Sequence, residues 1–180
     1  MIDQVERTTD IVILMFYFAR EVRGVTKVQK ILYLMEKETE FYEAYKDKLT
    51  DELDFKAYNM GPFSENVYDE LEFLINIGAL EKDSMELDAA DSYEVKSFEE
   101  REEALGASNE LSNKVFKITD KGDKIGEKLV QVLEDEYVEE IKELTRKYNK
   151  KSLSNVLEYV YTAYPDSARN SKIRDEVLKQ

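Results

Sequence analysis

Apolar residues recur with a helical period along most of this chain, and few residues interrupt the pattern. Only six glycines and two prolines occur in 180 residues, so the sequence predicts a helix-rich fold. The first helix is predicted from near Asp3 to Arg23, ending at Gly24. Its centre, residues 11–19, is apolar on every side. Such a helix must be covered all round, either by its own domain or by a partner chain.

A second helix is predicted over residues 26–42. Thr26 and Gln29 have the spacing of a capping box, with Thr26 at the N-cap. The buried face of this helix is predicted at Val28, Ile31, Leu32, Met35 and Tyr42.

A short strand and a third helix follow. Residues 54–58 alternate polar and apolar side chains, which is typical of a strand. Gly61-Pro62 breaks the chain, Ser64 is a good N-cap, and Gly78 ends the helix predicted over residues 65–77. The apolar face of this helix holds Val67, Tyr68, Leu71, Leu74 and Ile75. We expect that face to pack against the second helix.

Two further strands and several helices complete the predicted elements. Residues 80–82 and 114–119 are the strands, and between them lies an acidic wing loop at about 83–112. One or two long helices follow Asp120, and Ser152 caps a final helix. The buried stripe of the long helices holds Ile125, Leu129, Val132, Leu133, Ile141 and Leu144. That of the final helix holds Leu153, Val156, Leu157, Val160 and Tyr161.

This order of elements predicts a winged-helix-like domain with added N- and C-terminal helices. The fold class is mostly α with a small antiparallel β-wing. We expect residues 1–130 to form that domain, including the acidic wing loop. Residues 131–180 are expected to be a C-terminal helical extension that packs on the same domain.

Composition narrows the range of functions. The chain has no cysteine and no histidine, which excludes zinc sites of the usual kind and nucleophilic triads. The acidic run at residues 99–103 lacks the Asp/Asn spacing of a calcium loop. We therefore expect no enzyme, no metal and no cofactor. The longest apolar run is far shorter than the ~20 residues that span a bilayer, and no basic leader is seen, so a cytoplasmic protein is expected.

Negative charge is concentrated in one part of the chain. The net charge is −14, and residues 47–110 carry five basic and nineteen acidic side chains, an excess equal to the whole net charge. The third helix contributes Glu65, Asp69, Glu70 and Glu72 and has no lysine or arginine. In a DNA-binding winged helix this element would lie against phosphates, which require cations. We therefore expect these four carboxylates to bind a protein partner with a basic surface, and the competing interpretation is an ordinary solvated helix face.

Two stretches resemble the Panacea domain, also called the SocA-like antitoxin domain. They are Gly24-x-Thr26-Lys27-x-Gln29-Lys30-x-Leu32-Tyr33 and Phe55-x-Ala57-Tyr58-x-x-Gly61-Pro62-x-Ser64-x-x-x-Tyr68. The chain departs from the family at Tyr58, where tryptophan is frequent, and at Phe63, where a smaller residue is common. The resemblance implies an antitoxin-like or regulatory protein whose partner is a toxin. For the turn at residues 61–64, a purely structural role is the competing interpretation.

The alternative function is DNA binding by a winged-helix transcription regulator. Its phosphate contacts would come from the only basic stripe, which consists of Lys117, Lys121, Lys124 and Lys128. Asp120, Asp123 and Glu127 interleave with that stripe and largely cancel its field.

The apolar first helix also predicts self-association into a homodimer. The competing interpretation is that the C-terminal helices of the same chain cover it.

Overall fold

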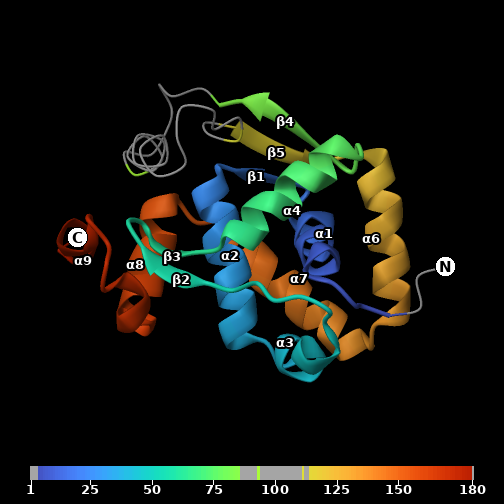
Figure 1. The fold of residues 1–180 in the computed structure, drawn as a ribbon, viewed down its shortest axis with the longest axis horizontal. Helices are drawn as coiled ribbons and strands as arrows, with labels where there is room; N and C mark the ends of the chain where they lie inside the picture. The colour runs from blue at the N-terminus through green and yellow to red at the C-terminus, as the bar shows by residue number, and fades with distance from the viewer. Residues whose placement is uncertain (1–3, 86–92, 94–110, 112–113, 180) are drawn as a thin grey trace.

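The computed structural model describes residues 4–85, 93, 111 and 114–179, and they form a mostly helical molecule with a small antiparallel sheet (Figure 1). The predicted fold class is therefore confirmed. The predicted acidic wing loop falls largely outside the described residues.

Helix α1, Thr8–Ala19, forms the centre of the molecule and is shorter than predicted. Asp51 binds its first residue, accepting from the Thr8 N–H at 2.9 Å and from Thr8 Oγ1 at 2.7 Å. The helix ends at Arg20, whose φ of 67° turns the chain. Residues 21–23 then form strand β1, Glu21–Arg23. The prediction of a helix up to Arg23 was wrong, because these three residues pair with a strand distant in sequence.

The sheet has three strands in the order β1-β5-β4. Strands β4, Leu80–Ser84, and β5, Lys114–Ile118, are the predicted pair. In the antiparallel register, Phe116 lies between Val22 on β1 and Lys82 on β4. Together with the helix order, this sheet gives the topology of a winged-helix domain, in which the first short strand joins the wing.

The second predicted helix is divided in two. Helix α2, Val25–Glu38, begins after Gly24, whose φ is 85°, and α3 is Glu40–Tyr45. Thr39 separates them, since its Oγ1 donates to Met35 O and accepts from the Tyr42 N–H. The predictions of a capping box at Thr26 and of one continuous helix to residue 42 were therefore wrong.

A hairpin and helix α4 follow. Strands β2, Lys56–Tyr58, and β3, Gly61–Phe63, pair antiparallel, where the sequence predicted only the first. Ser64 caps α4, Glu65–Asn76, as predicted. Gly78, with φ 77°, ends it, and Ala79 N donates to Leu74 O. Helix α4 rests mainly on α1, so the expected packing of its apolar face on the second helix was wrong. Helix α2 packs on α7, α8 and β3 instead.

The C-terminal helices complete the fold within the same chain (Figure 1). They are α6, Asp120–Val132, α7, Asp135–Asn149, α8, Leu153–Ala163, the 3-10 helix η3, Pro165–Ala168, and α9, Arg174–Leu178. Helices α6 and α7 pack against α1, and α7 and α8 pack against α2. The apolar residues 11–16 of α1 are buried, so α1 requires no second copy of the chain to cover it.

Ser152 caps helix α8, and the predicted buried face of this helix is confirmed. Within the described part of the chain, no helix combines the length and apolar character needed to cross a bilayer.

Candidate functional site

The two motif segments of the family resemblance lie against each other. The side-chain amide of Gln29, on α2, donates to Ser64 O and accepts from the Ser64 N–H, both at 2.9 Å. Lys30 Nζ donates to Pro62 O at 2.9 Å. These bonds fix α2 to the hairpin and to the beginning of α4.

Several motif residues therefore have structural roles. Lys30 is almost completely buried, and Lys27 Nζ donates to Asn149 O at the end of α7. Gly61 has φ 87°, and a β-carbon there would lie 2.6 Å from the Tyr161 ring. The structural interpretation of the turn at residues 61–64 is the one that the structure supports.

The three motif tyrosines occupy different environments. Tyr33 is buried, Tyr68 packs on the core, and Tyr58 is 39% exposed on the hairpin. Only Tyr58 therefore presents much of its ring to solvent.

Three of the four carboxylates predicted to bind a partner share the open surface of α4. Glu65, Asp69 and Glu72 are exposed, and none forms an ion pair with another described residue. Glu70 differs, since it is half-buried and accepts a hydrogen bond from Thr9 Oγ1 at 2.5 Å. Its role is to tie α4 to α1.

An aromatic side chain that the sequence analysis missed lies among these carboxylates. Phe73 is 46% exposed, more than any other large apolar residue in the described ranges. It follows Glu72 and lies one turn after Asp69 on the helix. Glu65, Asp69, Glu72 and Phe73 are called the α4 surface below.

The basic stripe does not act as one unit. Lys117 Nζ pairs with Asp83 at 3.1 Å. The hydrogen bond to Asp83 and the negative charge of that residue raise the pKa of Lys117. Lys121 Nζ donates to Ile77 O at 2.6 Å, at the C-terminal end of α4. Lys124 and Lys128 are exposed on α6. Two of the four lysines are thus bound to protein groups.

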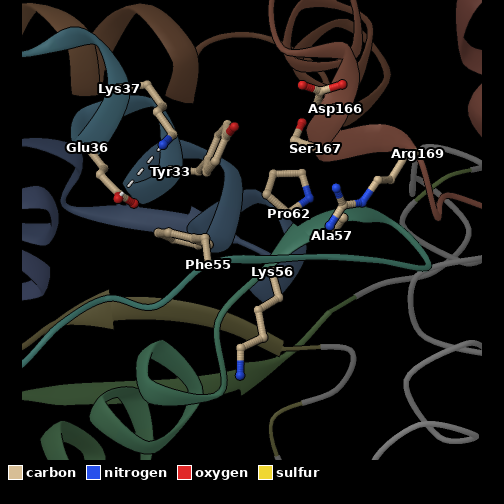
Figure 2. A pocket seen from close by; sticks show the side chains of 10 residues that line it. All are labelled: Tyr33, Glu36, Lys37, Phe55, Lys56, Ala57, Pro62, Asp166, Ser167 and Arg169. Carbon is tan, nitrogen blue, oxygen red and sulfur yellow. Dashed lines mark ion pairs between the residues drawn. The ribbon is translucent and has the colours of Figure 1, made fainter.

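A surface cleft of about 430 Å³ lies where α2, the hairpin and η3 meet. Figure 2 shows that Glu36 and Arg169 stand at opposite ends, with Tyr33, Phe55 and Pro62 between them. Glu36 Oε2 is buried and has no hydrogen-bond partner among the described residues. Burial raises the pKa of Glu36, and the negative charges of Glu52 and Asp54 add to this, while Lys37 opposes it.

A second polar cluster fixes the C-terminal helices to α2. The Glu38 carboxylate accepts hydrogen bonds from the hydroxyls of Tyr148, Tyr159 and Tyr164 at 3.2, 2.5 and 3.0 Å. Burial raises the pKa of Tyr148 and of Tyr164, and the bond to Glu38 raises that of Tyr159. The cluster is a structural joint between segments far apart in sequence.

No family model, curated protein or solved structure matches this chain. The resemblance to the Panacea domain therefore stays a prediction carried by the quoted residues alone. Among the described residues, no group of three or more acidic side chains is placed to hold a metal ion.

The charge pattern located most of the α4 surface, but neither Phe73 nor the cleft. Phe73 lies outside the apolar stripe of its helix, and this position in the sequence would have predicted an exposed aromatic side chain. The cleft had no such signal, because three distant segments build it.

Proposed function

We propose that this chain is a non-enzymatic interaction module, antitoxin-like or regulatory, that binds a basic protein partner through the α4 surface. One observation carries the proposal. The helix at the position that contacts DNA in winged-helix proteins presents Glu65, Asp69 and Glu72 to solvent and has no cation.

Charge favours a basic protein over a nucleic acid. Glu65 and Asp69, one turn apart, repel each other, and a partner's cations would relieve that repulsion. DNA phosphates would increase it, and the net charge of −14 would add long-range repulsion. A toxin with a basic surface is the partner that the resemblance suggests.

Phe73 supplies the apolar part of this surface. Exposed aromatic side chains bury a large area on binding and are enriched among the residues that dominate interface energy. Carboxylates around such a ring steer a basic partner and set its orientation. The α4 surface therefore combines an anchor with a charged rim.

Cellular location and self-association belong to the same proposal. We place the protein in the cytoplasm, and a homodimer stays a prediction, now without support from α1, which is covered internally. Light scattering tests the dimer, and a mass of 21.1 kDa, that of one chain, would contradict it.

The test reverses the charge of the α4 surface. Proteins captured from cell extract are compared between the wild type and the variant Glu65→Lys, Asp69→Lys, Glu72→Lys. The matched control reverses three exposed α7 residues, Glu136, Glu139 and Glu143. A basic protein retained by the wild type and the control, but lost by the α4 variant, supports the proposal.

The captured protein then allows a kinetic test. Its association rate should fall as salt rises, because steering between opposite charges is screened. Equal capture by all three proteins would contradict binding at α4.

A further inference from the structure

The cleft in Figure 2 goes beyond the proposed function, because none of its lining residues belongs to the α4 surface. Its volume of about 430 Å³ lies in the range of small-molecule sites, roughly 300–1,000 Å³. Its walls come from α2, the β2–β3 hairpin and η3.

One end of the cleft carries a carboxylate that lacks a hydrogen-bond donor among the described residues. Neither oxygen of Glu36 accepts a hydrogen bond from a described residue, and Lys37 Nζ is 4.0 Å from Oε1. That distance permits an ion pair but is too long for a hydrogen bond. The Glu36 side chain is 23% exposed, so a donor entering the cleft can reach the carboxylate. Burial without donors is costly for such a group, and a cationic ligand group would offset that cost.

The other end carries the Arg169 guanidinium, and Asp166 also lines the cleft on this side. Arg169 is exposed, and its guanidinium forms no ion pair within the described part of the chain. Lys56 differs, since it pairs with Asp54 at 3.5 Å and extends away from the cleft. A planar guanidinium with five donors suits a carboxylate, which it binds with two parallel hydrogen bonds.

Apolar groups lie between the two charges. The rings of Tyr33 and Phe55 meet edge to face, with centroids 5.3 Å apart, and Pro62 lies beside them toward Arg169 (Figure 2). A ligand with opposite charges at its two ends would place its carbon chain against these groups.

We infer that this cleft binds a small zwitterion of amino-acid size, with its ammonium group on Glu36 and its carboxylate on Arg169. A simple cation would leave Arg169 unused, and a simple anion would leave Glu36 without donors. The zwitterion satisfies both ends and buries its alkyl chain.

Calorimetric titration with matched probes tests the assignment. The ω-amino acids from 4-aminobutanoate to 7-aminoheptanoate vary the distance between the charges. Pentanoate and pentylammonium each carry one charge. The best ω-amino acid should bind the full chain at least about tenfold more tightly than either singly charged probe, because it forms both charged contacts. If no ω-amino acid binds more tightly than the singly charged probes, the inference is overturned.

Four variants assign the two ends. Glu36→Gln should reduce zwitterion binding to the level of pentanoate, and Arg169→Gln to that of pentylammonium. Lys37→Gln should tighten binding, because it removes the cation that competes for Glu36. Lys56→Gln, the matched control for Arg169, should change affinity less than about twofold. Wild-type affinity in both Glu36→Gln and Arg169→Gln, with melting temperatures unchanged, would contradict the assignment.

Discussion

At the residue scale, Ser64 is the point where the two motif segments meet. The Gln29 side chain pairs with both the N–H and the carbonyl of Ser64. The Ser64 hydroxyl donates to Leu53 O and accepts from the Val67 N–H. Ser64 and Gln29 are both fully buried. Every one of these polar groups therefore depends on a protein partner.

The first prediction follows from this pairing. Gln29→Leu removes both bonds and leaves the buried Ser64 N–H without a partner, at about 1–3 kcal/mol, while Ser64 O keeps only the Tyr68 N–H at 3.4 Å. The melting temperature should fall by roughly 2–4 °C per kcal/mol, the range for a chain of this length. Gln131→Leu, the same change at an exposed site on α6, should stay within about 0.5 kcal/mol. Equal effects at the two sites in urea unfolding would contradict the role of Gln29.

At the element scale, local signals predicted some boundaries and missed others. Ser64 and Gly78 bound α4 as expected, because a cap and a left-handed stop act within a few residues. Strand β1 was missed because it exists only through pairing with β5. The break at Thr39 depends partly on Glu140, whose carboxylate accepts the N–H groups of Glu40 and Phe41. Contacts across about a hundred residues leave no local pattern.

The same distinction separates the two candidate sites. The carboxylates of the α4 surface were visible because one helix carries them at regular spacing. The cleft joins Glu36 on α2, Phe55 before the hairpin and Arg169 after η3. Only the assembled fold brings them together.

The second prediction concerns the joint between α2 and the C-terminal helices. The hydroxyls bound to Glu38 have raised pKa values, and burial raises the pKa of Tyr42 to about 12. Tyrosine in the unfolded chain ionises near pH ~10. A pKa raised on folding gives stability that is complete below that pH and is lost as pH rises above it. The free energy of unfolding should therefore fall between about pH 10 and 12.

The variant Tyr148→Phe, Tyr159→Phe, Tyr164→Phe provides the comparison. It should be less stable at neutral pH and should lose less stability above about pH 10. The same loss in both proteins would show that the Glu38 cluster does not cause the pH dependence.

At the scale of the whole molecule, charge sets the third prediction. The net charge of −14 disfavours the compact state by self-repulsion. Raising salt from about 10 to 200 mM should therefore raise the melting temperature, because the Debye length shortens. The triple α4 lysine variant has a net charge of −8, since three reversals add six charges to −14, and should respond less. An equal salt response in the two proteins would contradict this electrostatic account.

Retention of DNA on a filter, at about 50 and 200 mM salt, tests the central claim that α4 binds protein and not DNA. The wild type should retain no duplex at either concentration, because the helix in the DNA-contacting position exposes three carboxylates and carries no lysine or arginine. The triple α4 lysine variant, once shown to be folded, sets the comparison. If the wild type retains DNA tightly and in a salt-sensitive way, and the lysine variant does not, then α4 contacts DNA and the account is contradicted.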